Sequence, residues 1–228
     1  MKIYKSILAL IFIACFTDIA LSQQLITING HCGLYCKNMV QVEKQFDSQV
    51  KFYDFHPGEM VASIGAQCAN WEAVFAALTD SVTFYLEDID SISLNEKQVN
   101  FAWEYYSKLR GQPITCYHKI VIGTETTTNL PDSFFDKILI INSFHEFNDK
   151  ATMLSDLRKK LKRNGTLMID EVLAQKSGEL HIQCKKRIYT DDEMQTIFRE
   201  NGFRYIKGLD MHFKNAKPTR KIFVFVKA

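Results

Sequence analysis

Polar residues follow two apolar segments of the sequence at points where a cofactor could bind. Gly65 lies in the loop of residues 63–70, where a glycine lets the backbone approach a ligand closely. Glu87 and Asp88 end the next apolar segment, and a carboxylate at the end of such a strand can accept both hydroxyl groups of a ribose. We favour Asp88 for this role. The alternative is a solvated acidic turn that caps the next helix.

Two later segments could line the same pocket. Residues 123–131 form a polar stretch that either surrounds an adenine ring or lies on the surface. Residues 142–147 combine aromatic side chains with the titratable pair His145 and Glu146, which is typical of the lining of a pocket. The alternative for this second segment is the start of a helix that contains a hydrogen-bonded histidine.

Alternating apolar and amphipathic patterns predict the elements that position these residues. We expect strands at residues 60–64, 82–86, 114–122, 136–141, 166–170, 203–209 and 221–226. Helices are predicted at residues 37–50, 70–78, 94–109 and 150–161, the last of them stopped by Asn164-Gly165. A final helix should open at Thr190 and close at Asn201-Gly202.

Several of these strands are apolar on both faces, which indicates a parallel sheet covered by helices on both sides. Residues 210–220 are too few for a crossover helix, so the last two strands should pair antiparallel. The predicted fold is a single α/β domain, doubly wound around a mostly parallel seven-stranded sheet with an antiparallel terminal strand. Such sheets bind ligands beyond the carboxyl ends of their strands.

The N-terminus has the layout of a secretory signal peptide. Two lysines precede an apolar run from residue 7 to 16, and the small residues Ala20 and Ser22 favour cleavage after Ser22. The run is shorter than the roughly 20 apolar residues that a membrane-spanning helix needs. One alternative is a buried first helix. Another is a lipoprotein whose Cys15 carries a lipid, and only then would a membrane be a partner.

These observations predict a signal peptide at residues 1–22, a helical lead-in at 23–57 and the main domain at 58–228. The protein would be exported, either to the periplasm or as a secreted protein. The net charge of +2 is too small to indicate a nucleic-acid partner.

Cleavage after Ser22 would leave an odd set of cysteines, namely Cys32, Cys36, Cys68, Cys116 and Cys184. We expect mostly buried free thiols, because a domain of this size can bury enough apolar surface without disulfide bonds. A Cys32–Cys36 bridge is the lesser alternative.

The spacing of these cysteines is compatible with parts of two kinds of metal site. Cys32 and Cys36 have the spacing of the first two ligands of a radical iron–sulfur cluster, but Met39 stands where the third cysteine is needed. His31, Cys32 and Cys36 could bind zinc with Cys184 or His181 as the fourth ligand. Because the sequence has no second closely spaced pair, we predict that these residues are structural and that no metal is bound.

Taken in order, four segments resemble the class I S-adenosylmethionine-dependent methyltransferases. Residues 61–69 (VASIGAQCA) lie where that family has its glycine-rich loop, and residues 85–90 (YLEDID) lie where it has its ribose-binding acid. Residues 130–138 (LPDSFFDKI) are similar to the approach to its fourth strand. Residues 161–169 (LKRNGTLMI) are similar to the stretch before its fifth strand. The resemblance implies a Rossmann-like fold.

The resemblance also implies a cofactor and its site. S-adenosylmethionine would lie with its methionine end near Gly65 and its ribose near Asp88. The implied cofactor-binding residues are Ser63, Gly65, Gln67, Asp88, Ile89, Thr124 and Asn142. The implied catalytic bases are His145, Glu146 and His181.

The first loop departs from the family pattern. Ser63 stands where the family has an acid, while Gln67 and Ala69 replace its second and third glycines. Side chains at these positions can crowd the methionine end of the cofactor. Two functions therefore stay open. The first is a methyltransferase that acts on a small molecule or a component of the cell envelope. The second is a non-catalytic exported binding module on a degenerate methyltransferase scaffold, in which Gln67 would block the pocket.

Overall fold

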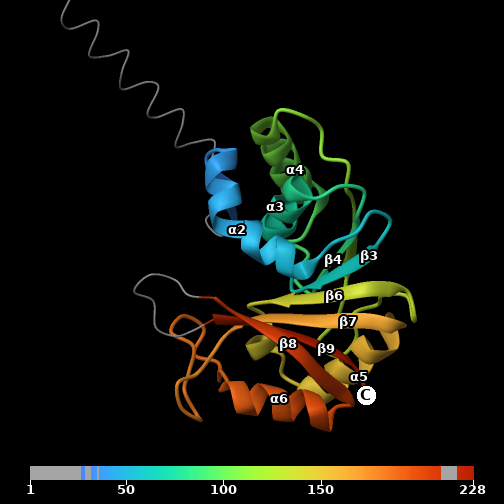
Figure 1. Cartoon of the computed structure of the whole chain (residues 1–228), viewed down its shortest axis with the longest axis vertical. Helices are drawn as coiled ribbons and strands as arrows, with labels where there is room; N and C mark the ends of the chain where they lie inside the picture. The colour runs from blue at the N-terminus through green and yellow to red at the C-terminus, as the bar shows by residue number, and fades with distance from the viewer. Residues whose placement is uncertain (1–26, 29–31, 35, 212–219) are drawn as a thin grey trace, which may run out of the picture.

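The structure is a computed structural model that describes residues 27–28, 32–34, 36–211 and 220–228 (Figure 1). The predicted signal peptide, the lipidation site Cys15 and the zinc candidate His31 lie outside these residues. A short pair of antiparallel strands, β1 (Thr27–Ile28) and β2 (Cys32–Gly33), precedes the main domain. The sequence analysis did not predict this pair.

The main sheet has seven strands: β3 (Met60–Ile64), β4 (Thr83–Asp88), β5 (Tyr117–Ile122), β6 (Phe135–Ile141), β7 (Leu161–Val172), β8 (Phe203–Met211) and β9 (Arg220–Lys227). Their order across the sheet is β5-β4-β3-β6-β7-β9-β8. β9 runs antiparallel to β7 and β8, and the other neighbouring pairs are parallel. The predicted fold class, including the antiparallel terminal strand, is confirmed.

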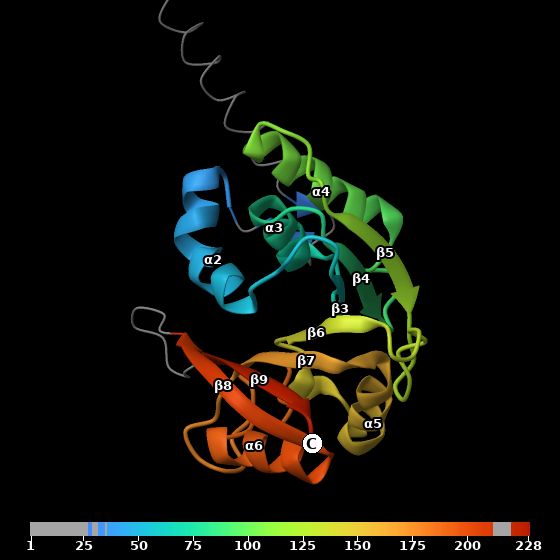
Figure 2. The same cartoon turned by 45° about the vertical axis from the view of Figure 1, so that its right-hand side comes forward.

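Helices cover both faces of this sheet (Figures 1 and 2). The helices α2 (Met39–Tyr53), α3 (Asn70–Leu78) and α4 (Glu96–Arg110) pack on one face, and α5 (Lys150–Lys160) and α6 (Asp191–Glu200) pack on the other. Strand β6 contributes to both cores, because Leu139 and Ile141 face the first group while Ile138 and Ile140 face the second. This double burial explains why β6 is a continuous apolar run in the sequence.

Among the residues that the structure describes, no helix combines the length and the hydropathy that crossing a membrane requires.

One predicted boundary is wrong for a physical reason. Helix α5 ends at Lys160 and strand β7 begins at once, so Asn164-Gly165 lies inside a strand instead of stopping a helix. A Cβ at Gly165 would lie 2.8 Å from the carbonyl oxygen of Phe135, beside a register shift between β6 and β7. A glycine therefore permits close backbone approach at an irregularity of the sheet.

A buried charge network connects α2 to the sheet. Asp170 of β7 is fully buried, and its carboxylate accepts hydrogen bonds from Gln49 and Tyr53 of α2. It also accepts a hydrogen bond from the guanidinium of Arg220 on β9. The same guanidinium lies over the ring of Trp71 at the start of α3, 4.8 Å from its centroid. These contacts fix α2, α3 and β9 relative to β7.

We predict that Asp170→Ala lowers the free energy of unfolding by about 3–5 kcal/mol, because it leaves the charge of Arg220 buried without its partner. Urea denaturation followed by circular dichroism measures this change. Asp210→Ala is the matched control, since that carboxylate is largely exposed and lies 4.0 Å from the ammonium of Lys221. Equal stabilities of the two variants would contradict the importance of the network.

Candidate cofactor-binding site

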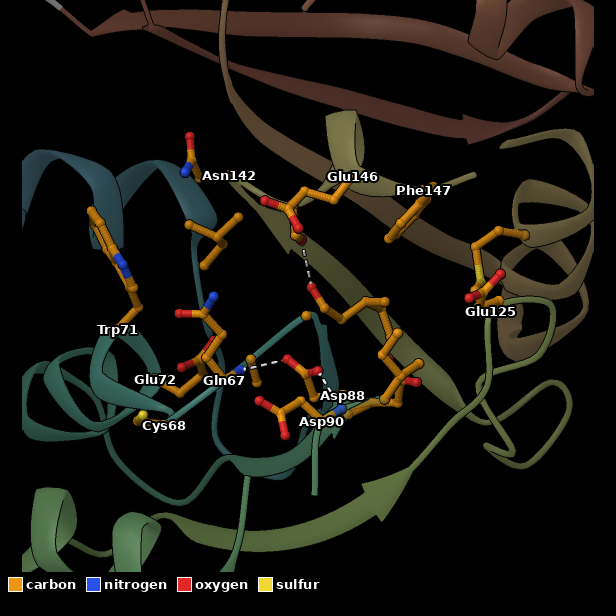
Figure 3. Close-up of a pocket in the computed structure, with 18 of the residues that line it drawn as sticks. Gln67, Cys68, Trp71, Glu72, Asp88, Asp90, Glu125, Asn142, Glu146 and Phe147 are labelled. Atoms are coloured by element: carbon orange, nitrogen blue, oxygen red, sulfur yellow. Dashed lines mark hydrogen bonds between the residues drawn. The ribbon is translucent and has the colours of Figure 1, made fainter. Parts of the chain in front are cut away.

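A cavity of about 440 Å³ lies at the carboxyl ends of β3, β4 and β6. The chain passes from β3 to β4 and β5 on one side of the sheet and then returns to β6 and β7 on the other. The cavity therefore occupies the point where strand order reverses, which is where doubly wound sheets bind ligands. Figure 3 shows Trp71 and Gln67 on one side of it, Asp88 and Asp90 at its base, and Glu146 and Phe147 across from them.

The loop after β3 requires a glycine at its first position. Gly65 has a φ of 73°, and a Cβ there would lie 2.6 Å from both Cβ and Oγ of Ser143. The backbone N–H groups of Gly65 and Ala66 each donate to the carbonyl oxygen of Glu87 at 2.9 Å. This loop is thereby held against the end of β4, with no room for a side chain at Gly65.

The two departures from the glycine pattern keep a glycine-like backbone. Gln67 and Ala69 have φ values of 46° and 54°, in the left-handed region. Non-glycine residues adopt this region at a cost of roughly 1–2 kcal/mol each. The N–H of Gln67 donates to the carboxylate of Asp88 at 2.8 Å, which helps to hold the loop in this conformation. The cavity persists beside the Gln67 side chain.

Ser63 stands where the family pattern has an acid, and a carboxyl group from another element lies beside it. Ser63 is buried and does not line the cavity; its hydroxyl donates to the carboxylate of Glu72. Glu72 projects from α3 and does line the cavity. Burial raises the pKa of Glu72 to about 7. Glu72 was not predicted from the sequence, because this residue lies on a predicted helix and not in the loops that follow the strands.

The sequence favours Asp88 over Glu87 as the acceptor of the ribose hydroxyls. In the structure Glu87 is the more deeply buried of the two. Its Oε1 has no hydrogen-bond partner among the described residues, and a Cβ at Gly123 would lie 1.8 Å from that oxygen. Burial, followed by the charge of Asp88, raises the pKa of Glu87 to about 8. Burial therefore favours the neutral form of Glu87, whose Oε1 is enclosed beside Gly123.

The predicted cofactor-binding residues are largely brought together. Besides Gly65 and Gln67, the cavity is lined by Asp88, Ile89, Thr124 and Asn142, so that of the seven candidates only Ser63 lies behind the wall. The two oxygens of Asp88 accept the N–H groups of Gln67 and Asp90, each at 2.8 Å. The N–H of Asn142 donates to the carbonyl oxygen of Asp170 at 2.7 Å. Their contacts with a cofactor stay predictions.

The three candidate bases are not equivalent. Glu146 lines the cavity and is about half exposed. His145 and His181 are not part of the wall, and their rings lie side by side behind it with centroids 4.6 Å apart. His145 is buried, with Nδ1 at 3.0 Å from the carboxylate of Glu171. Burial and the nearby His145 lower the pKa of His181.

The charge of the cavity limits its ligand. Six carboxyl groups line it, and no Lys, Arg or His among the described residues does so: Glu72, Glu87, Asp88, Asp90, Glu125 and Glu146. A wall with acids alone repels phosphates and suits a cation that also carries hydroxyl groups. S-adenosylmethionine fits, because its sulfonium and ammonium outweigh its one carboxylate and it also carries a ribose. Glu72 and Glu87 add carboxyl groups to the wall on two different elements, α3 and β4.

The cysteines agree with the prediction in part. Cys68, in the loop between β3 and α3, is disulfide-bonded, whereas Cys36 and Cys116 are buried free thiols and Cys184 is an exposed one. Because Cys36 is free, the Cys32–Cys36 bridge is wrong. A disulfide bond from the loop after β3 was not expected from the size of the domain.

Comparison with known proteins agrees with the fold. A family model described as a methyltransferase domain matches residues 73–169, beginning just after the divergent loop. YdaC, an uncharacterized methyltransferase of Bacillus subtilis (strain 168), is 27% identical over 100 residues, which are 44% of this chain and 51% of that protein. The match thus spans about half the length of this curated relative.

Solved structures share the fold at low sequence identity. A SAM-dependent methyltransferase from Aquifex aeolicus has a TM-score of 0.59 at 20% identity, covering 81% of this chain and 92% of its own. The [4+2]-cyclase SpnF has a TM-score of 0.59 at 14% identity, covering 89% of this chain and 88% of its own. The domain match and the fold support the class I S-adenosylmethionine-dependent methyltransferase family for this chain, and they point to S-adenosylmethionine as its cofactor.

The raised pKa values of Glu72 and Glu87 predict that stability falls as pH rises from about 5 to about 8. In that range the unfolded state has lost these protons while the folded state still holds them, so each group costs up to about 1.4 kcal/mol per pH unit. Glu87→Gln should remove the Glu87 part of this loss. Urea denaturation at several pH values measures it.

Glu125→Gln is the control for this prediction, since it alters an exposed carboxyl of the same cavity. If Glu87→Gln keeps the pH dependence of the unaltered protein, Glu87 is already ionised in the folded state near neutral pH.

Proposed function

We propose that this protein is an exported methyltransferase that uses S-adenosylmethionine to methylate a small molecule or a component of the cell envelope. The observation that carries the proposal is the acid-only cavity at the strand switch point, framed by the Gly65 loop and the end of β4. It is supported by the methyltransferase domain match over residues 73–169.

In this proposal the loop and the strand end share the binding of the cofactor. The left-handed conformations of Gly65, Gln67 and Ala69 bring the chain close to the methionine end. Asp88, already oriented by the Gln67 and Asp90 N–H groups, accepts the ribose hydroxyls. The ionised form of Glu87 faces the positive charge. When bound, the cofactor supplies an electrophilic methyl group, and the protein mainly has to position an acceptor in line with it.

The acceptor would enter from the side of Glu146, Phe147 and Asn148, opposite Gln67 (Figure 3). Of the three candidate bases only Glu146 lines the cavity, so Glu146 is the proposed group that takes a proton from the acceptor. Phe147 gives this side an apolar surface, which favours an acceptor with an apolar or aromatic part.

Export is supported by two independent features. The N-terminal sequence has the layout of a signal peptide, and Cys68 is disulfide-bonded in the loop next to the cavity. Fractionation of the native host, with mass analysis of the N-terminus, tests this part of the proposal. An uncleaved chain in the cytoplasmic fraction would contradict it.

The second candidate, a non-catalytic module, is favoured by Gln67 and Ala69, which replace glycines in the loop. The non-catalytic module predicts that Gln67 blocks the cavity. The cavity of about 440 Å³ beside that residue weighs against it.

We expect Asp88→Asn to weaken the binding of S-adenosylmethionine at least tenfold, because it removes the charge and one hydrogen-bond acceptor while keeping the shape of the side chain. Isothermal titration calorimetry on the purified protein measures the dissociation constant. Asp210→Asn, an exposed position on β8, is the matched control. Unchanged affinity in Asp88→Asn would exclude the ribose role of this residue.

Binding of S-adenosylmethionine should also release protons near pH 7. A cation in the cavity favours the ionised forms of Glu72 and Glu87, whose pKa values lie at about 7 and about 8 in the free protein. The affinity should therefore rise between pH 6 and pH 9. The rise is roughly tenfold for each unit by which the bound cation lowers the pKa of one of these carboxyl groups. Titrations in buffers of different ionisation enthalpy count the released protons.

Glu87→Gln should bind with fewer released protons and a flatter pH profile. If Glu87→Gln releases as many protons on binding as the unaltered protein does, the protons come from another group. A titration without any heat, from a folded sample at high cofactor concentration, would overturn the methyltransferase proposal in favour of the non-catalytic module.

A further inference from the structure

Three potential metal ligands converge behind the cavity, on the side of Glu146. His145, His181 and Cys184 each offer one ligand atom, and these three atoms all lie within 4.8 Å of one another. The Nδ1 of His181 is 3.2 Å from the sulfur of Cys184. The sequence analysis considered His181 or Cys184 only as additions to His31, Cys32 and Cys36 and predicted no metal.

His145 is already arranged as a ligand. Its Nδ1 lies 3.0 Å from the buried carboxylate of Glu171, and its backbone N–H donates to the same group at 3.3 Å. Donation from Nδ1 leaves the lone pair on Nε2, which is buried and has no hydrogen-bond partner among the described residues. A histidine that donates one ring N–H to a carboxylate and directs its other nitrogen into a site is the usual arrangement of a metal-bound imidazole.

His181 and Cys184 are held together by a tight turn. The N–H of His181 donates to the carbonyl oxygen of Lys186 at 2.8 Å, and the N–H of Lys185 donates back to that of His181 at 3.1 Å. An antiparallel β-bridge between Leu180 and Arg187 closes the hairpin. Both ligands are therefore present in their relative positions before any ion binds.

From these contacts we infer that the protein binds one zinc ion through His145 Nε2, the His181 ring and the thiolate of Cys184. Two imidazoles and a thiolate form a donor set that suits zinc, and tetrahedral zinc needs neighbouring ligand atoms roughly 3.3–3.8 Å apart. The separation of His181 and Cys184 is close to this value, and rotation of their partly exposed side chains brings them to His145. Glu171 holds the ring of His145 without touching the ion.

The fourth position of this site faces the cofactor cavity. Glu146 Oε1 is 3.7 Å from Nε2 of His145, and Glu146 is also part of the cavity wall. A zinc ion here would fasten the hairpin of residues 180–187 to the short 3-10 helix η1 (Phe144–Glu146). It would thereby shape the side of the cavity at which the acceptor is proposed to enter.

Metal titration of the purified protein, stripped with a chelator and with the Cys184 thiol shown to be reduced, tests this inference without any cofactor or activity. We expect one Zn²⁺ per chain. Co²⁺ should give an intense thiolate-to-metal absorption band that Zn²⁺ removes. Cys184→Ser should abolish the band, and His181→Ala should weaken Zn²⁺ binding at least tenfold.

Two variants serve as controls. His56→Ala removes an exposed histidine far along the sequence, and Cys36→Ser removes a free thiol from the other zinc set that the sequence suggested. Both should bind Zn²⁺ as the unaltered protein does. Weak or substoichiometric binding in the unaltered protein, or binding that Cys36→Ser abolishes while Cys184→Ser does not, would overturn the inference. Cys184 is exposed, so its substitution should not impair folding.

Discussion

The carboxylate of Asp170 is the contact on which the arrangement of the site depends. It is buried in β7, the strand next to β6. It accepts hydrogen bonds from Gln49 and Tyr53 of α2 and from Arg220 of β9. An unpaired charge in that position would be very costly, so all four groups must be in place together. The lead-in helix and the last strand, which are far apart in the sequence, are fixed by one interaction.

This network continues into the wall of the cavity in two directions. The guanidinium of Arg220 lies over Trp71, which begins α3 and lines the cavity. The backbone carbonyl of Asp170 accepts the N–H of Asn142, which is held in a left-handed conformation at the end of β6 and also lines the cavity. The packing of the core and the shape of the site are therefore not separable in this protein.

The sequence predicted the fold well because its signals are local. The apolar run of β6 and the acidic first turn of α6 can be recognised without knowing what they contact. The end of α5 could not be recognised, because Gly165 resembles a helix stop in sequence and is a site of close backbone approach in space. The disulfide of Cys68 was missed for a related reason, since the size of a domain says nothing about a single cross-link.

The same limit applies to the site. Gly65 and Asp88 could be located because each follows a predicted strand. Glu72 could not, since its importance comes from reaching across to Ser63, nine residues earlier. His145, Glu171, His181 and Cys184 come from three separate segments, and only the folded chain shows that one histidine is buried against a carboxylate and faces the other two groups. Spacing along the chain cannot reveal such a cluster.

The acidity of the cavity has a consequence for turnover. In the proposed reaction the sulfonium that enters is positively charged at sulfur, whereas the thioether that remains after transfer is neutral there. A wall of six carboxyl groups therefore holds the spent cofactor less tightly than the fresh one. Because Glu87 can take its proton back once the cation is gone, the wall also loses negative charge at that moment. In the proposed reaction, the loss of the sulfonium charge therefore favours exchange of the spent cofactor.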